Sequence, residues 1–342
     1  MWRTTITVLS RALSVVILVC SVFQISLAQD ETAAAQHKET LQQIYEAAIG
    51  KGDVDLLDAH YSADYVNHGF GEDLDLSGFK GFINAWVSAM PDFSVTPEVI
   101  IANKDDEWAA SRVIFSGTFS DKWVLGDQVI EPNNKAIQIS FNILHRFDDS
   151  GKIAEDFTAF DPLSMLLQMD AAPKLPDLIA YTLVTGKISP IVLGEAVSEG
   201  MEQAHKQGYA GVIDDSLNKG DLTAIDKYMV EDYLTHEPFG NFTRDTFKKV
   251  VQLFRQVVPD LHVAMEITVA EGDWLAGRLV YTGTFKQPIS QDDVTLAASG
   301  KPIKFIINVF VRFNKDGIGV EDYKEYNRLG WLQQLGLVEA AS

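Results

Sequence analysis

The chain has 342 residues and, with 28 Lys and Arg against 48 Asp and Glu, a formal net charge of −20 at pH 7. A hydrophobic fraction of 46% and a charged fraction of 22% are typical of a folded protein, and the length suffices for about two domains. The excess of acidic residues argues against nucleic acid and anionic membrane surfaces as partners, because both would repel the chain.

Residues 1–28 have the pattern of a secretory signal peptide. Arg3 and Arg11 provide a basic start, residues 12–23 are almost entirely apolar, and Ser26 and Ala28 are the small side chains expected before a cleavage site. An uncleaved membrane anchor is the alternative, although the apolar run is short for a bilayer span of roughly 20 residues. Because the single cysteine lies in this leader, the mature chain is expected to have no disulfide and no thiolate metal ligand. We therefore predict an exported protein, periplasmic or secreted, that contacts no membrane after cleavage.

The rest of the chain contains an internal duplication. A Lys-Gly-Asp segment at 51–53 recurs at 219–221, and an Asp-Tyr-x-x-His segment at 64–68 recurs at 232–236. Further matched pairs follow in the same order: Pro91 and Pro259, Arg112 and Arg278, Gly117 and Gly283, Arg146 and Arg312, Glu155 and Glu321. This shared register predicts two related domains, 37–170 and 205–338.

Each copy is expected to begin with helices and to end with an antiparallel sheet. Four apolar residues have the i, i+3, i+4, i+7 spacing of a buried helix face: Leu41, Ile44, Tyr45 and Ala48. A second helix is predicted over 79–90 and again over 247–258, each ended by Pro-Asp. Apolar and polar residues then alternate over 137–143 and 303–311, which indicates strands. The predicted fold class is α+β, with helices on one face of a curved antiparallel sheet.

The segment 171–204 joins the two copies. It contains Pro173, Pro176 and Pro190 but is otherwise rich in apolar side chains. We expect it to pack against both domains and to fix their relative position.

The order and spacing of these motifs resemble the SnoaL-like polyketide cyclase family of the nuclear transport factor 2-like superfamily. The shared pattern is Lys-Gly-Asp, Asp-Tyr-x-x-His, a helix ending in Pro-Asp, Arg-x-x-x-(Ser/Thr)-Gly-Thr, then Arg-Phe-x-x-x-Gly-x-x-x-Glu-Asp. The resemblance implies two cone-shaped α+β barrels, each with a bent sheet that wraps helices around an apolar pocket. It also implies acid/base chemistry by a pocket carboxylate, without metal or cofactor. Domains of this kind usually dimerise through the sheet, so the two copies are expected to form an internal pseudo-dimer in a monomeric chain.

Asp161 is the first catalytic candidate. It lies near the end of the last strand of copy one, where similar cyclases carry their acid/base aspartate. Its apolar neighbours would desolvate the carboxyl group and raise its pKa, as proton abstraction from carbon requires. An N-cap before Pro162 is the alternative. The second copy has Asn327 here, which cannot act as a base and argues against catalysis in that copy.

His68 is the second catalytic candidate, with His236 as its counterpart. Each follows a strand-like segment and could point its ring into the pocket as a hydrogen-bond donor or proton shuttle. A structural histidine that ties a loop to the first helix is the alternative. A metal role is not expected, because no second ligand lies at suitable spacing near His68.

Further residues are expected to contact the substrate. Arg112 and Arg278 are candidate partners for an acid that faces the pocket, and alternation allows only one acid of Glu155-Asp156 to do so. Of the other candidates, the asparagines on the long strands occupy equivalent positions in the two copies, and Trp86 is expected in the core or pocket wall. The full set of residues predicted to bind substrate is Asn142, Trp86, Arg112, His236, Asn308 and Asn327.

The sequence contains no Gly-rich phosphate loop, Gly-x-Ser-x-Gly elbow, His-Glu-x-x-His segment or basic aromatic stripe. The predicted function is a cofactor-independent acid/base enzyme that acts on a small hydrophobic carbonyl compound by cyclisation, isomerisation or a related proton transfer. The alternative is a non-catalytic exported protein that binds such a small molecule.

Overall fold

The computed structural model describes residues 33–69, 71–104, 106–175, 188, 190, 191, 200–291 and 294–338. The predicted signal peptide and most of the 171–204 segment lie outside these residues. Within them, no helix is both long and apolar enough to cross a bilayer. We call residues 33–175 the first half and residues 200–338 the second half.

The first half begins with a helix over 33–43 that continues as a π-helical turn. Its further elements, in chain order, are η1 (Ile44–Ile49), η2 (Val54–Leu56), α2 (Leu57–His60), β1 (Tyr61–His68), α3 (Leu76–Ala89), β2 (Ser94–Ala102), β3 (Trp108–Thr118), β4 (Trp123–Leu125), β5 (Gln128–Ile130), β6 (Ala136–Phe147), β7 (Ile153–Ala159) and α4 (Pro162–Gln168).

The second half repeats this order with one additional strand, β9, and, among its described residues, without a separate helix equivalent to η2. Its elements are α6 (Glu202–Gly211), η3 (Val212–Asn218), α7 (Thr223–Tyr228), β8 (Met229–Glu237), β9 (Gly240–Thr243), α8 (Arg244–Val257), β10 (His262–Glu271), β11 (Trp274–Thr284), β12 (Ile289–Gln291), β13 (Val294–Leu296), β14 (Pro302–Phe313), β15 (Gly319–Glu325) and α9 (Arg328–Gln334).

The two main sheets have the same topology. The first has the strand order β1-β7-β6-β3-β2, and the second has β9-β8-β15-β14-β11-β10. The pairs β1–β7 and β8–β15 are parallel, whereas the other neighbours are antiparallel. Each half is a cone-shaped α+β barrel, so the predicted fold class is confirmed.

Two repeated motifs connect the long helix of each half to its sheet. Asp92, which follows the end of α3, accepts hydrogen bonds from the backbone N of Thr118 at 2.6 Å and from its Oγ1 at 2.8 Å. Asp260 makes the same two contacts with Thr284 in the second half. These bonds to Thr118 lower the pKa of Asp92. The Pro-Asp and Gly-Thr segments recur in the sequence because they form one structural unit.

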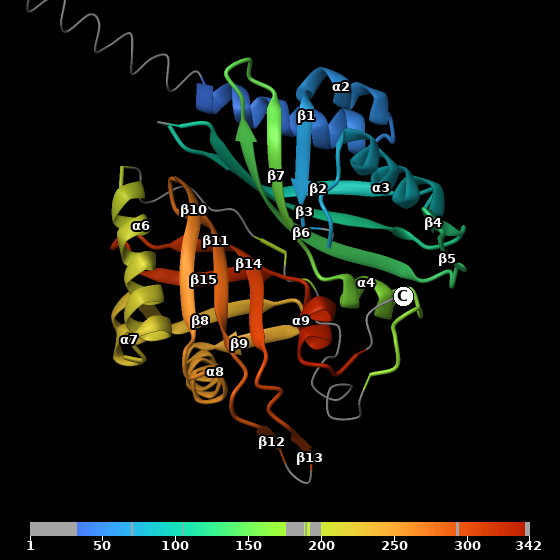
Figure 1. Ribbon diagram of the computed structural model, residues 1–342. Coiled ribbons are helices and arrows are strands. Elements are labelled where there is room, and N and C mark those ends of the chain that lie inside the picture. The colour runs from blue at the N-terminus through green and yellow to red at the C-terminus, as the bar shows by residue number, and fades with distance from the viewer. Residues whose placement is uncertain are drawn as a thin grey trace, which may run out of the picture.

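Both faces of the central strands are buried: one faces the interior of the cone, and the other packs against the other half of the chain. On β6, Phe141 and Ile143 point into the cone, while Asn142 and Leu144 point to the opposite face and are equally shielded from solvent. That opposite face packs against the sheet of the second half. Figure 1 shows α2 and α3 of the first half and α6, α7 and α8 of the second half on the outer sides, with the sheets between them and α4 close to α9 where the halves meet. The apolar part of this contact is formed by Val99, Ile101, Ala110, Leu144, Val269, Trp274, Ala276, Phe310 and Tyr323.

Candidate functional site

The interior of the first cone contains a pocket that we call the cone pocket. Its wall is largely aromatic, and the side chains close around a cavity of only about 10 Å³. The residues that line it come from η1, β1, α3, β3, β6 and β7, and they are Tyr45, Ile49, Tyr61, Phe79, Phe82, Phe115, Phe141, Ile143, His145, Asp156 and Thr158. The polar groups are therefore few and lie together at one side of an apolar chamber, as in many small-molecule sites.

A continuous chain of hydrogen bonds runs along this side of the cone pocket. Tyr45 Oη lies 2.6 Å from Ser111 Oγ, which lies 2.8 Å from His145 Nε2. His145 Nδ1 lies 2.6 Å from Asp156 Oδ1, and Tyr65 Oη donates to Asp156 Oδ2 at 2.7 Å. Each of these five residues is buried. A buried polar network in which every member is paired holds its side chains in one arrangement.

The direction of donation along this chain follows from the tyrosines. Burial raises the pKa of Tyr45 and of Tyr65, and the nearby carboxylate of Asp156 raises both further. Both phenols are therefore protonated and can donate, Tyr45 to Ser111 and Tyr65 to Asp156. Ser111 can then donate to His145 Nε2, and His145 Nδ1 to Asp156, which satisfies every group with a neutral imidazole. In this arrangement the Nε2 lone pair accepts from Ser111, and it becomes available to a substrate when the Ser111 hydroxyl turns toward Tyr45 Oη.

The second cone has a different set of polar groups. Val311 stands where the first half has His145, and Gly277 stands in place of Ser111. Asp322, the counterpart of Asp156, is bound by Thr235 Oγ1 and lies 3.3 Å from Lys324 Nζ. Burial opposes the charge on Lys324, but the carboxylates of Asp322 and Glu237 outweigh it and raise the pKa of the amine. The second cone therefore contains a fixed ion pair where the first has an imidazole and a carboxylate.

Asp161 does not lie in the cone pocket. It caps α4, since its Oδ2 accepts from the backbone N of Ser164 at 2.9 Å. The same Oδ2 accepts from Arg328 Nε at 2.8 Å and from Arg328 Nη2 at 2.5 Å, across the contact between the halves. A guanidinium lies where apolar surroundings were expected. Of the two roles considered, pocket base and helix cap, the structure shows Asp161 as a helix cap. Asn327 caps α9 in the same way through Gly330 N at 2.7 Å.

His68 and His236 also lie outside the cones, which differs from the expected placement. Because Tyr65 of β1 points into the cone, His68, three residues later, points to the opposite face. Its ring stacks on Phe157 with centroids 4.7 Å apart, and its Nδ1 lies 2.8 Å from Asp73 Oδ1. His236 stacks on Tyr323 in the same manner, at 4.3 Å. Both rings thus lie where the two halves meet.

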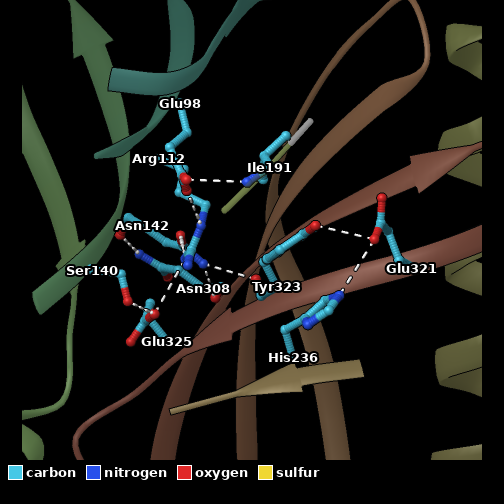
Figure 2. Close-up of polar contacts among 10 residues, drawn as sticks. All are labelled: Glu98, Arg112, Ser140, Asn142, Ile191, His236, Asn308, Glu321, Tyr323 and Glu325. Atoms are coloured by element: carbon cyan, nitrogen blue, oxygen red, sulfur yellow. Dashed lines mark hydrogen bonds and ion pairs between the residues drawn. The ribbon is translucent and has the colours of Figure 1, made fainter. Parts of the chain in front are cut away.

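Arg112 holds the two halves together instead of pairing with an acid in the cone, and Figure 2 shows its contacts. Its Nε lies 3.1 Å from Glu98 Oε2, and its Nη1 lies 3.2 Å from Glu325 Oε1 in the second half. Its Nη1 also donates to Asn142 Oδ1 at 2.9 Å. The guanidinium lies 5.1 Å from the centre of the Tyr323 ring. The inward acid, Asp156, is paired with His145 instead.

Asn142 and Asn308 were expected to line the pockets, but they face away from them. Asn142 Nδ2 donates to Asn308 O at 2.9 Å, and Asn308 Nδ2 donates to Asn142 O at 3.0 Å, so the two amides cross-link the halves symmetrically (Figure 2). Strand alternation places the two asparagines on the face opposite the apolar residues of their strands. The apolar residues face the interior of the cone, so the asparagines face away from it. The polar face forms the contact between the halves.

Trp86 is the one predicted substrate contact that lies in the first cone. It is fully buried on α3, and its ring packs edge-on against Phe115 and Phe141, which line the cone pocket. Its Nε1 has no hydrogen-bond partner among the described residues. A substrate contact by Trp86 stays a prediction.

The sequence interpretation missed His145, Tyr45 and Ser111 as functional residues. A signal for His145 was present, because it continues the alternation of the inward residues of its strand, Ile139, Phe141 and Ile143. No comparable signal pointed to Ser111, whose partners come from two other elements. In the part of the chain that the structure describes, no group of three or more His, Cys, Asp and Glu side chains has the geometry of a metal site.

Comparisons with known proteins agree with this architecture. A model of the SnoaL-like polyketide cyclase family matches residues 39–169 and again residues 209–335. Among curated proteins, none matches the chain significantly.

Three solved structures illustrate the similarity to single-domain proteins. AclR from Streptomyces galilaeus is 20% identical over 41% of this chain and 86% of its own, with a TM-score of 0.37. IdmH from Streptomyces antibioticus is 25% identical over 39% of this chain and 98% of its own, with a TM-score of 0.34. A SnoaL-like polyketide cyclase from Agrobacterium tumefaciens is 22% identical over 39% and 98%, with a TM-score of 0.32.

Proposed function

The chain belongs to the SnoaL-like polyketide cyclase family, and on that premise we propose that its first half is a cofactor-independent acid/base enzyme. Its substrate would be a small hydrophobic carbonyl compound, and its reaction a cyclisation, an isomerisation or a related proton transfer. The observation that carries this proposal is the His145–Asp156 pair in the wall of an aromatic pocket.

His145 is the proposed base. The Ser111 hydroxyl turns its proton toward Tyr45 Oη, which frees both the Nε2 lone pair and the Tyr45 proton. His145 Nε2 then takes a proton from the carbon next to a substrate carbonyl, and Asp156 holds the Nδ1 proton and stabilises the imidazolium that forms. Tyr65 keeps the carboxylate in place through its hydrogen bond to Oδ2. The imidazolium returns its proton at the end of the reaction, so that the enzyme is regenerated unchanged.

Tyr45 is the proposed stabiliser of the negative charge that develops on the substrate oxygen. Its phenol is protonated, lines the cone pocket and lies 3.3 Å from His145 Nε2. A hydrogen bond from this hydroxyl to an enolate oxygen is strengthened by the apolar surroundings. In a cyclisation, the enolate carbon then attacks a second carbonyl of the same molecule. A carbon–carbon bond forms, and the new alkoxide takes its proton from the imidazolium.

The test is α-proton exchange in D₂O, followed by NMR with a panel of aromatic ketones and β-dicarbonyl compounds. We expect His145→Gln and Asp156→Asn to slow exchange by roughly 10²–10⁴-fold, the usual contribution of a positioned acid/base group. His68→Gln and Asp161→Asn remove the same types of side chain outside the cone pocket and serve as controls. Because Asp161→Asn leaves Arg328 buried without its carboxylate, its melting temperature is measured alongside as a check on folding. Loss of exchange in Asp161→Asn, with retention in Asp156→Asn, would instead place the base at the cap of α4.

A further inference from the structure

A larger pocket lies where the two halves meet, at the edge of the second cone, and we call it the junction pocket. Its cavity volume is about 460 Å³. The first half contributes the ends of β1 and β7, and the second half contributes β11, β14 and α9. The side chains that matter here are His68, Phe157, Arg278, Lys304, Phe305 and Trp331.

The duplication generates a second copy of this pocket from equivalent residues. In that copy, which we call the ionic pocket, His236, Arg112 and Gln138 correspond to His68, Arg278 and Lys304. The cavity volume of the ionic pocket is only about 30 Å³. The same positions therefore enclose very different amounts of space in the two pockets.

Buried ionic groups fill the ionic pocket, and their counterparts in the junction pocket are small or uncharged. Asp161 and Glu325 line the ionic pocket, and Arg328 and Arg112 pair with them. Asp161 corresponds to Asn327 in the junction pocket, and Glu325 corresponds to Ala159. The junction pocket is therefore open because it lacks the ion pairs that close its twin.

Backbone geometry also keeps the junction pocket open. Gly69 lines it with a φ of +144°, and a Cβ at this position would lie 1.9 Å from the carbonyl oxygen of Thr158. Only glycine permits so close an approach of the two chain segments. The corresponding residue of the ionic pocket is Glu237, whose side chain pairs with Lys324 at 3.1 Å.

The lining of the junction pocket combines cations and aromatic rings. The guanidinium of Arg278 lies 4.7 Å from the centre of the Phe157 ring. Among the described residues it forms an ion pair with Glu266 at 3.3 Å, a carboxylate that is 50% exposed. Lys304 is exposed and forms no ion pair with any described residue. The acidic groups of the lining, Glu72 and Asp73, lie on the side of the first half, where Asp73 is bound to His68.

We propose that the junction pocket binds a small aromatic carboxylate. The carboxylate lies on the side of Arg278 and Lys304, where charge-assisted hydrogen bonds are available, and the ring packs against Phe157, Phe305 and Trp331. Burial lowers the pKa of Arg278, and an anion beside the guanidinium would offset that cost. This site is separate from the cone pocket and takes no part in the proton transfer proposed above.

The test is isothermal titration of the mature chain with 2-naphthoate and with the neutral isostere 2-naphthalenemethanol. We expect the naphthoate to bind, and Lys304→Gln to weaken its binding about fivefold, the size of one solvent-accessible charge contact. Lys301→Gln is the matched control, because it removes the same charge from an exposed residue outside the pocket. Ile306→Trp fills the pocket and should abolish binding, with the melting temperature as a check on folding.

Three results would overturn the proposal. The first is no binding at low-millimolar naphthoate. The second is equal weakening by Lys304→Gln and Lys301→Gln. The third is loss of binding in Phe82→Trp, which narrows the cone pocket, while Lys304→Gln binds normally. The α-proton exchange assay is independent of all three, so the two proposals can fail separately.

Discussion

Removing Arg328 tests the energetic link between the two halves. The side chains of Arg328 and Asp161 are only 1% and 2% exposed, and the pair is made by two contacts of 2.5 and 2.8 Å. Arg328→Met leaves the Asp161 carboxylate buried without its cation. A buried pair broken on one side costs about 3–5 kcal/mol, whereas the loss of an exposed pair costs about 0–1 kcal/mol. We expect the lower part of the first range, because Asp161 Oδ2 keeps its bond from Ser164 N.

The assay is urea unfolding followed by tryptophan fluorescence and by circular dichroism, since agreement of the two probes establishes a single transition. Lys135→Met is the matched control, because Lys135 pairs with Asp170 at 2.7 Å where both side chains are more than half exposed. Asp161→Asn combined with Arg328→Met should be more stable than Arg328→Met alone, because asparagine keeps the helix cap without a charge. A loss in Arg328→Met no larger than that in Lys135→Met would refute the reasoning.

Two further perturbations test Glu325, which is buried where the halves meet, and Gly69, which lies against Thr158 within the first half. Burial raises the pKa of Glu325 to about 7 despite the nearby Arg112. The folded state therefore binds a proton that the unfolded state has released, and the free energy of unfolding should fall by on the order of 3 kcal/mol as pH rises from about 4.5 to 7. Glu325→Gln should remove this component in unfolding experiments across that range, and an unchanged pH profile would contradict it. Gly69→Ala should destabilise the chain by about 2 kcal/mol or more, because its Cβ would meet Thr158 O at 1.9 Å, whereas Gly71→Ala meets no atom within 4 Å. Equal melting temperatures for these two variants would count against a close approach at Gly69.

The two halves have kept one fold while their interiors have diverged. The first cone holds a chain of hydrogen bonds that runs through His145 to the Asp156 carboxylate, and the second holds a lysine bound between two carboxylates. In a homodimer every substitution would change both subunits at once. A duplicated chain has no such constraint, so one cone can carry chemistry while the other supports the shared sheet contact.

The sequence by itself determined the local structure and the duplication. The helix period of three to four residues, the strand period of two and the repeated motifs are properties of short segments, and they were enough to predict two related α+β domains. The cone-shaped barrel followed from the resemblance to the family. The helix expected over 79–90 is α3, and the one expected over 247–258 is α8, each displaced by no more than three residues.

Only the tertiary structure decided what each face of a strand contacts. Alternation separates Asn142 from Phe141, but both are buried, and no local pattern says that the amide meets the second half while the ring faces the cone. From the sequence, Asp161 could be a pocket base or a helix cap. Only its contact with Arg328, 167 positions away in the chain, distinguishes the two. The pairing of His145 with Asp156 likewise depends on the register of two neighbouring strands. Hydrophobic periodicity is set along the chain, whereas ion pairs and proton relays are set by packing between distant segments.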